Sequence, residues 1–446
     1  MSEDRNDLFE RNLDAMCDLL AAGCKTDGER RVGLELERVL VDGDGKRIFF
    51  SGTQARNDDR DGVHAILSRL AADRPDLNRV DVGGHLMGFS YRFAAPDEDD
   101  GILVAVSLEP GAQIEVSVGP ARHAKALLAA IDAFDADVLQ AARELGVEAC
   151  FAARGYDPAC IDPRDVELIP KERYKLMDAY LPARGRYARD MMRCSGSTQV
   201  SVDYRSEADA ARLARRATVL GPILSFLFDN APHFRGEETS GMARSRIWRA
   251  VDPVRCGTVP GSLDAGFGFR SFCSWVASVP VILFSDRDGV TYDAKNRLAA
   301  DYMRDRVLTN DELMHLISMT WPTFRLKGYL ECREMDALPP RLAVACAVIT
   351  VAVLYADDLE RVLPFAWDAL TEADVAAARA ALEDNGWDAS PYGAPIADIA
   401  AALAERARRE HPDGFDRASI DLFATMWAHR RLPRTYSLEE LESMGR

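Results

Sequence analysis

The order of hydrophobic and polar residues in the first third of the chain predicts one helix followed by several short strands. Residues 7–24 carry apolar residues at helical spacing, which is typical of an amphipathic helix. Alternating runs separated by glycine, proline and aspartate then predict β-strands. These runs are residues 31–41, 85–93, 103–108 and 112–118. A helical period returns over residues 120–146.

The rest of the chain predicts a mixture that becomes helical toward the C-terminus. Strands are expected over residues 197–204 and 276–284, with an irregular stretch rich in glycine and arginine over residues 236–275. Ser206 is placed to cap a helix over residues 207–229, in which Pro222 should produce a kink or break.

Alanine-rich helices dominate from about residue 340 to the end. Thr371 and Asp374 form a capping-box pattern, and Asn385-Gly386 marks the end of that helix. No internal repeat, low-complexity linker or clear break divides the sequence. We therefore expect an α+β fold in a single domain over residues 1–446, with residues 340–446 as a helical C-terminal region packed on it.

Composition and charge exclude several classes of protein. The 446 residues are 48% hydrophobic and 28% charged, and the net charge of −17 disfavours general binding to nucleic acid or anionic membranes. No apolar run approaches the ~18–20 residues that span a bilayer, and the polar N-terminus does not have the pattern of a secretory leader. We expect a cytoplasmic protein with small-molecule partners, no nucleic acid and no membrane partner. The oligomeric state stays open.

The cysteines and histidines do not predict disulfide or zinc sites. Nine cysteines are scattered along the chain without a CxxC pair, which is typical of reduced thiols in a cytosol. Seven histidines are also scattered, without the HExxH spacing of a zinc site.

Acidic and amide side chains share one face of three predicted strands. Glu35 and Glu37 are two residues apart, so a strand points both to the same side. Glu115 and Gln199 lie in similar alternating runs, and Glu109 precedes a Pro-Gly turn. If the strands share a sheet, the carboxylates repel one another and a hard divalent cation such as Mg²⁺ relieves the repulsion. The alternative is a set of ordinary amphipathic strands with one face in water.

Basic residues cluster around one acid in residues 325–333. As a single strand, this segment would point Arg325, Lys327, Glu331 and Arg333 to one side. Such a set suits a metal-bridged polyphosphate, because the acid holds the ion and the bases neutralise the phosphate oxygens. A surface strand with cross-strand ion pairs is the alternative.

A second basic group lies in the glycine-rich stretch. Arg244 and Arg246 could bind a carboxylate in two-pronged fashion, with Trp248 as a wall of the pocket. The sequence contains neither a GxxxxGK[ST] motif nor a strand–GxGxxG–helix unit, so any ATP site differs from a P-loop or Rossmann crevice.

In order along the chain, these motifs resemble the glutamate–cysteine ligases of the plant and proteobacterial type. Relatives of these enzymes include actinobacterial enzymes that make γ-glutamylcysteine for ergothioneine. The most specific segments are Ser-Leu-Glu-Pro-Gly-Ala-Gln-Ile-Glu at residues 107–115 and Arg-Leu-Lys-Gly-Tyr-Leu-Glu-Cys-Arg at residues 325–333. The other matching segments are residues 32–37, 174–180, 191–203, 244–248 and 266–269, so the resemblance covers roughly residues 31–335.

The resemblance implies a glutamine-synthetase-like fold, in which a curved, mainly antiparallel sheet surrounded by helices binds metal and nucleotide on its concave face. It also implies a set of site residues. The metal ligands would be Glu35, Glu37, Glu109, Glu115, Gln199 and Glu331. The phosphate contacts would be Arg325, Lys327 and Arg333, with Arg325 and Arg333 catalytic. The glutamate pocket would contain Arg244, Arg246 and Trp248.

The implied reaction is a ligation that uses ATP and Mg²⁺ as cofactors, carried out by a single catalytic domain. The γ-carboxylate of glutamate is joined to the amine of cysteine through a γ-glutamyl phosphate, which gives γ-glutamylcysteine for glutathione, ergothioneine or another small thiol. Two alternatives stay open: a γ-glutamyl ligase with a different amine acceptor, and a non-catalytic homologue that binds metal and nucleotide.

Three positions depart from the pattern of this family. The family commonly has asparagine at Ser201, a second glycine at Ala112 and glutamate at Thr323. These departures concern the details of substrate binding more than the metal ligands.

Overall fold

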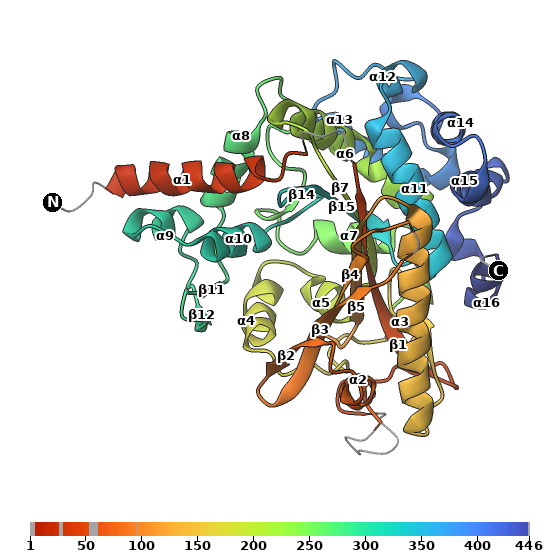
Figure 1. Cartoon of the computed structure of the whole chain (residues 1–446). Coiled ribbons are helices and arrows are strands. Elements are labelled where there is room, and N and C mark those ends of the chain that lie inside the picture. Colours follow the sequence, from red (N-terminus) through yellow and green to blue (C-terminus); the bar gives the residue numbers. More distant parts are fainter. Residues whose placement is uncertain (1–4, 26–29, 53–60, 96, 445–446) are drawn as a thin grey trace.

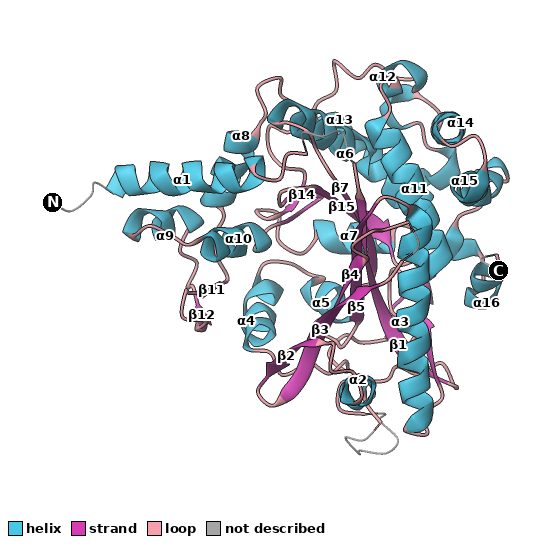
Figure 2. Ribbon diagram, in the orientation of Figure 1, coloured by secondary structure: helices cyan, strands magenta, loops and turns pink. Residues whose placement is uncertain are grey.

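A large antiparallel sheet forms the centre of the molecule (Figure 2). The computed structural model describes residues 5–25, 30–52, 61–95 and 97–444. Within this part of the chain, the sheet has nine strands in the order β14-β15-β7-β1-β5-β4-β3-β2, with β6 paired to β1. Its strands are β1 (Val32–Asp42), β2 (Asn78–Val82), β3 (His85–Phe93), β4 (Ile102–Leu108), β5 (Ile114–Ala121), β6 (Ala149–Ala152), β7 (Ser197–Val202), β14 (Phe324–Leu326) and β15 (Leu330–Asp336).

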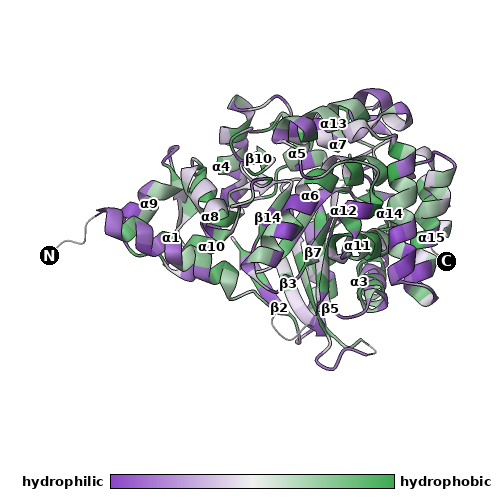
Figure 3. Cartoon of the chain, turned by 90° about the horizontal axis from the view of Figure 1, so that it is seen from above, coloured by the Kyte–Doolittle hydropathy of each residue, from purple (hydrophilic) through white to green (hydrophobic). Residues whose placement is uncertain are grey.

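Long helices cover one face of this sheet (Figure 1). They include α3 (Ala124–Glu144) and α11 (Pro340–Tyr355). Helix α11 is apolar on nearly all sides and runs through the interior, surrounded by other helices (Figure 3). It packs against α3, α6 (Glu207–Leu227), α14 (Ile396–Glu410) and α15 (Gly414–Ala428). The C-terminal region also contains α12 (Leu359–Val362), α13 (Glu372–Asn385) and α16 (Leu438–Ser443). Residues from α1 to α16 contribute to one continuous hydrophobic core.

Shorter helices lie on the opposite side of the sheet. They are α4 (Glu172–Tyr180), α5 (Ala188–Cys194) and α7 (Ala243–Arg249). A helical group extends away from the sheet at the N-terminal end, with α1 (Arg5–Ala21), α8 (Phe269–Ser278), α9 (Ala299–Asp305) and α10 (Asn310–Ser318) (Figure 1). The remaining elements are α2 (Val63–Ala72), β8 (His233–Phe234), β9 (Glu237–Glu238), β10 (Cys256–Gly257), β11 (Leu283–Ser285), β12 (Thr291–Asp293) and β13 (Trp321–Pro322).

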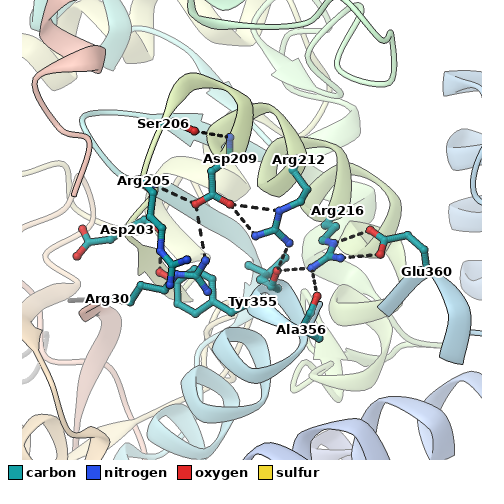
Figure 4. A network of polar contacts seen from close by, with 11 residues as sticks. Arg30, Asp203, Arg205, Ser206, Asp209, Arg212, Arg216, Tyr355, Ala356 and Glu360 are labelled. Carbon is teal, nitrogen blue, oxygen red and sulfur yellow. Dashed lines mark hydrogen bonds and ion pairs between the residues drawn. The ribbon is translucent and has the colours of Figure 1, made fainter. Parts of the chain in front are cut away.

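A polar network fixes the join between β7, α6 and α11 (Figure 4). The Arg30 guanidinium lies 3.9 Å from the centre of the Tyr355 ring, and the Tyr355 hydroxyl donates to the carbonyl oxygen of Asp203 at 2.8 Å. Asp209 in the first turn of α6 binds Arg212 at 2.7 Å. Because Asp203 follows β7 directly, this network holds one end of the central strands in place.

Most predicted elements of the sheet are confirmed. The strand over residues 85–93 agrees in full, and the other predicted strands of the first 204 residues differ only at their ends. Ser206 caps α6 as expected, because its side chain accepts a hydrogen bond from the backbone N–H of Asp209. The helix continues through Pro222, so the expectation of a break there is wrong. Thr371 and Asp374 form the predicted capping box, and Gly386 ends α13 with φ 54°.

Two predictions between residues 236 and 285 are wrong. The strand over residues 276–284 is the end of α8 and a short β11, and the irregular stretch contains α7 and most of α8. In α8 the buried residues Phe269, Phe272, Cys273, Val276 and Ala277 recur every three or four positions. This spacing is typical of a helix. The apolar run at residues 276–284 overlaps its last turn, which is why the sequence predicts a strand there.

Two observations concern the environment of the chain. The described residues contain no helix long and apolar enough to cross a membrane. All nine cysteines are free thiols.

Candidate active site

Pairing between the central strands brings the predicted acids together on one face of the sheet. Glu35 on β1 lies directly opposite Gln199 on β7, and Glu37 lies directly opposite Glu115 on β5. The Gln199 amide donates to the Glu37 carboxylate at 2.9 Å. Residues that are 78 and 164 positions apart in the sequence therefore share one surface, as the alternation of the strands predicts.

Glu109 reaches the same surface from the turn before β5. The Glu109 N–H donates to the Gln113 carbonyl oxygen at 3.0 Å, which closes the turn around Pro110 and Gly111. A side chain at Gly111 would overlap the backbone of Arg193, so this approach requires glycine. The Tyr174 hydroxyl lies 3.3 Å from the Glu109 carboxylate and orients it.

The clustered acids hold their protons more tightly than free carboxyl groups do. Burial, followed by the charges of Glu331 and Glu115, raises the pKa of Glu35 to about 7. Burial and the charge of Glu37 raise the pKa of Glu109 to about 7. Burial, with the charges of Glu109 and Glu37, raises the pKa of Glu115 to about 8. Burial also raises the pKa of Glu37. A cation bound between these carboxylates would reduce the electrostatic repulsion among them.

The basic segment forms a hairpin and not one strand. Strands β14 and β15 pair Arg325 with Glu331, and the chain turns at Gly328, which has φ 85°. The expectation of a single strand over residues 325–333 is therefore wrong, because the glycine in the left-handed region reverses the chain. The hairpin nevertheless gathers the side chains that a single strand would have aligned.

Three cations surround the Glu331 carboxylate. Arg325 lies 2.9 Å from it, Lys327 2.8 Å and Arg333 2.6 Å. Burial alone would raise the pKa of Glu331, but these three charges together hold it well below its ordinary value. Arg333 also binds the side-chain oxygen of Gln199 and so connects the basic group to the acids. One carboxylate cannot neutralise three cations, so the group has a positive excess that suits phosphate oxygens.

The donor set fits Mg²⁺ held jointly with phosphates. All the predicted ligands offer oxygen atoms, which hard divalent ions prefer. Among the described residues, no three His, Cys, Asp or Glu side chains are gathered tightly enough to form a metal site by themselves. Mg²⁺ is commonly held by one or two carboxylates together with substrate phosphates and water, and acids spread along a cavity match that mode.

These side chains line one cavity of about 270 Å³, here called the acidic cavity. Its lining includes Glu35, Glu37, Glu109, Glu115, Gln199, Arg325, Lys327 and Arg333. Glu331 lies beneath, fully buried under its three cations. A larger cavity of about 570 Å³, the strand-end cavity, continues from Glu35 along the first residues of β1 and the last residues of β5 and β7. The predicted metal and phosphate residues are therefore brought together.

A third cavity of about 160 Å³, the arginine-lined cavity, adjoins the acidic cavity. The two cavities share Trp248, Trp321 and Arg333. Arg244 and Trp248 reach the arginine-lined cavity from α7, four residues apart on the same face of the helix. The structure does not bring Arg246 to them: it lies on another face of α7 and binds the carbonyl oxygen of Glu383.

Several buried polar atoms beside the arginine-lined cavity have no hydrogen-bond partner among the described residues. These atoms are Arg244 Nε, Trp248 Nε1 and Thr323 Oγ1. Arg249, Arg333 and Arg379 add three more arginines to the lining. Buried donors are normally satisfied, so this set is arranged for a ligand that carries several acceptor oxygens.

Sequence reasoning missed the contribution of α13 to this cavity. Arg379 binds Glu334 at 2.8 Å and the Ser245 hydroxyl at 2.9 Å, and Glu383 accepts from the same hydroxyl at 2.9 Å. Both residues are buried and hold α7 against the sheet. No motif marks them. The only signal is a charged pair four positions apart on the buried face of an otherwise alanine-rich helix.

Comparisons with known proteins define the class to which this chain belongs. The profile of glutamate-cysteine ligase family 2 matches residues 31–418. The chloroplastic glutamate–cysteine ligase of Medicago truncatula is 30% identical over 363 residues, which cover 79% of this chain and 66% of the relative. The enzyme of Arabidopsis thaliana is 30% identical over 348 residues, covering 76% and 62%.

The chain is therefore a member of glutamate-cysteine ligase family 2, as the motifs indicated. It spans slightly less than two thirds of the length of these curated relatives. A solved structure of glutamate–cysteine ligase from Francisella tularensis in complex with AMP has a TM-score of 0.54 and 10% identity, covering 95% of this chain and 88% of that one. This likeness confirms the expected fold, a mainly antiparallel sheet with surrounding helices.

Proposed function

We propose that the protein is an ATP- and Mg²⁺-dependent ligase that joins the γ-carboxylate of glutamate to the amine of cysteine. The observation that carries this proposal is the arrangement of the two adjoining cavities. One offers carboxylates beside a basic group for a metal-bound polyphosphate, and the other offers several guanidinium groups and unpaired buried donors for a dicarboxylate. The family supports the same activity.

The cavities suggest an order of substrates along the sheet. The strand-end cavity has a largely apolar lining, with Leu103, Val118 and Pro120, and is large enough for the base and ribose of a nucleotide. Its opening to the acidic cavity at Glu35 would direct the phosphates toward Lys327, Arg325 and Arg333. Mg²⁺ ions, when held by one or two of the carboxylates of Glu35, Glu37, Glu109 and Glu115 at a time, with Gln199 beside them, would supply charge neutralisation to the triphosphate. Glu331, whose carboxylate binds three cations, would hold the basic group in place.

Glutamate would occupy the arginine-lined cavity. Arg244 and Thr323 donate to its α-carboxylate, and the indole N–H of Trp248 adds a further donor. The shared lining residue Arg333 then orients the γ-carboxylate toward the phosphates. A 160 Å³ space suits a molecule of this size and excludes a nucleotide.

The reaction proceeds in two displacements. A γ-carboxylate oxygen attacks the terminal phosphorus of ATP, the bond to the bridging oxygen breaks, and ADP leaves with that electron pair. Arg325, Lys327 and Arg333 stabilise the charge that develops on the transferring phosphoryl group. The acceptor amine, after losing a proton to reach its neutral form, attacks the γ-carbonyl carbon. Phosphate leaves with the carbon–oxygen electrons, and the nitrogen loses a second proton.

Domain organisation and cellular setting complete the proposal. Because one continuous hydrophobic core includes residues from α1 to α16, we assign the activity to a single catalytic domain over residues 1–446. Free thiols at all nine cysteines favour a reducing compartment such as the cytoplasm. The product would feed the synthesis of a small thiol such as glutathione or ergothioneine.

The test is ADP formation with glutamate and a panel of amines, with mass detection of each product. Cysteine should give the fastest turnover, a product of the mass of γ-glutamylcysteine and a requirement for Mg²⁺. Faster turnover with another amine would identify that amine, and not cysteine, as the acceptor. Nucleotide binding without ADP formation under any condition would contradict catalysis.

A further inference from the structure

The turn after the N-terminal helix lies against the turn of the β14–β15 hairpin. Residues 5–25 precede the part of the chain that the family profile matches, residues 31–418. Helix α1 ends in a tight turn, in which the Gly23 N–H donates to the carbonyl oxygen of Leu20 at 3.1 Å. A Cβ atom at Gly23 would lie 2.1 Å from the carbonyl oxygen of Gly328 and 2.3 Å from its Cα atom. The two backbones are therefore in direct contact, and only glycine fits at this point of the N-terminal turn.

Helix α1 is firmly held, so the position of this turn is fixed. The fully buried side chain of Asn12 forms three hydrogen bonds of 2.7 to 2.8 Å with backbone groups of residues 303–308. The buried Tyr204, just after β7, donates from its hydroxyl to the carbonyl oxygen of Leu20 at 2.7 Å. The Lys25 N–H in turn donates to the carbonyl oxygen of Tyr204 at 2.8 Å. The N-terminal turn is thus fastened to the central sheet on both sides of Gly23.

Gly328 lies between the two cavities that the proposed function assigns to the nucleotide. Lys327 lines the acidic cavity, and Tyr329 lines the strand-end cavity. The Lys327 N–H donates to the carbonyl oxygen of Tyr329 at 2.9 Å, which closes the hairpin turn and couples the two residues. A shift at Gly328 would therefore displace a cation of the phosphate group and a wall of the nucleotide cavity together.

The N-terminal turn also brings a cation to the strand-end cavity. The side chain of Lys25 lines this cavity, as Tyr329 does. Its ammonium group forms no hydrogen bond or ion pair with another described residue. Lys25 is two positions from the contact between Gly23 and Gly328, so its cation enters the cavity near the hairpin turn. A nucleotide that passes from the strand-end cavity to the acidic cavity would place its first phosphate there, and an ammonium group suits a phosphate oxygen.

We propose that the N-terminal turn is part of the nucleotide site, in which Gly23 positions the hairpin turn and the Lys25 ammonium binds the phosphate nearest the ribose. This assignment rests on the proposed ligase function and adds a segment that precedes the matched profile. Arg325, Lys327 and Arg333 act on the terminal phosphates, whereas Lys25 acts on the other end of the phosphate chain. Gly23 is a positioning residue, because it contacts the hairpin and not the nucleotide.

The contact of Lys25 is tested by the binding of AMP and adenosine, measured by calorimetry without glutamate or cysteine. AMP differs from adenosine by the phosphate that Lys25 should bind. Lys25→Gln should weaken AMP binding by about tenfold or more, the effect of losing a charge-assisted hydrogen bond. The affinity for adenosine should not change. Lys25→Arg keeps the charge and should bind AMP within about threefold of the wild type. Lys46→Gln is the control, because this exposed lysine lines none of the three cavities.

The positioning role of Gly23 is tested by Gly23→Ala in steady-state kinetics. The added methyl group overlaps Gly328 and displaces the hairpin turn, so kcat/KM for ATP should fall at least about tenfold, with a higher KM for ATP. The KM for glutamate should stay near the wild-type value, because Arg244 and Trp248 come from α7. A loss of folded protein lowers the apparent kcat and changes no KM, so the rise in the KM for ATP separates positioning from instability. Gly266→Ala is the control, because this exposed glycine has open space for a Cβ atom.

The N-terminal turn and the ligase function can fail separately. If the wild type ligates but Lys25→Gln binds AMP as tightly as the wild type, or loses AMP and adenosine equally, the contact of Lys25 is wrong and the ligase function stands. An unchanged KM for ATP in Gly23→Ala would contradict the positioning role. If the wild type binds AMP but forms no ADP with glutamate and any amine, the ligase function is wrong, and the comparison of AMP with adenosine still decides the role of Lys25. A wild type that does not bind AMP would overturn the nucleotide site itself.

Discussion

Removing one of the repelling carboxylates should stabilise the metal-free protein while it abolishes turnover. The variant is Glu115→Gln, which keeps the size of the side chain. In the wild type the Ser107 hydroxyl donates to the Glu115 carboxylate at 3.0 Å, and the amide oxygen of glutamine can accept the same hydrogen bond. Glu115 faces Glu37 across the strand pair, and its pKa is about 8 because of burial and the neighbouring acids. Ionisation of this group therefore opposes folding.

The magnitude follows from the difference in pKa between the folded and unfolded chains. A carboxyl group with a pKa raised from 4.5 to about 8 binds its proton more tightly in the folded state, so stability is retained below pH 4.5 and lost as the pH rises toward 8. At pH 8 this difference corresponds to about 4 kcal/mol before screening, since one pKa unit is about 1.4 kcal/mol. Solvent in the cavity screens the group, and we expect about 2 kcal/mol.

The assay is urea unfolding in the presence of a chelator at pH 5 and at pH 8. Glu115→Gln should gain about 2 kcal/mol at pH 8 and little at pH 5, and Mg²⁺ should stabilise it less than the wild type. With glutamate, cysteine and Mg²⁺, ATP turnover should fall at least about a hundredfold. The control is Glu405→Gln, an exposed acid on α14, which should change neither quantity. Equal stability of the two proteins at pH 8, or turnover near the wild-type rate, would refute the reasoning.

Three further predictions concern the neighbourhood of the site. Arg244→Met should raise the KM for glutamate more than about tenfold. Arg246→Met should leave this KM nearly unchanged, because Arg246 contacts α13 and not the cavity. Steady-state kinetics with varied glutamate concentration measure both values. Arg379→Met should lower the free energy of unfolding by about 3 kcal/mol, because it leaves the largely buried carboxylate of Glu334 without its partner. The double variant with Glu334→Gln should recover part of that loss in a denaturation experiment. Ala112→Gly should stabilise the protein by up to about 1 kcal/mol without loss of activity, because Ala112 has φ 62°, where an L-residue is strained; a lower melting temperature in this variant would contradict the expectation.

Much of the central sheet and the convergence of its acids follow from the sequence alone. The alternation that places Glu35 and Glu37 on one face needs only the geometry of a strand, because side chains of residues two apart point the same way. Sequence order also marks Glu109, since a Pro-Gly pair requires a turn at that point. These features are local, and each depends on a few consecutive residues.

The hairpin at Gly328 and the two helices between residues 243 and 278 show where local reasoning fails. A run such as residues 276–284 is apolar in any buried element, so its period is ambiguous until its neighbours are known. The prediction that Arg325 and Arg333 lie on the same face is confirmed, but the single strand on which it was based is wrong. The two residues lie on neighbouring strands of a hairpin, whose side chains point to the same face of the sheet. Local pattern can therefore identify side chains that meet without identifying the backbone that brings them together.

The sequence by itself determined which strands carry the acids, which segments carry the bases and to which family the motifs belong. Only the tertiary structure decided that Arg246 lies away from the cavity that Arg244 lines, that Arg379 of the C-terminal helices lines the same cavity, and that methionines of α4 and α5 share a cavity with Glu109. The physical reason is that strand and helix periods are set by neighbouring residues, whereas the walls of a cavity are formed by side chains from distant segments, whose relative placement depends on the packing of the whole core.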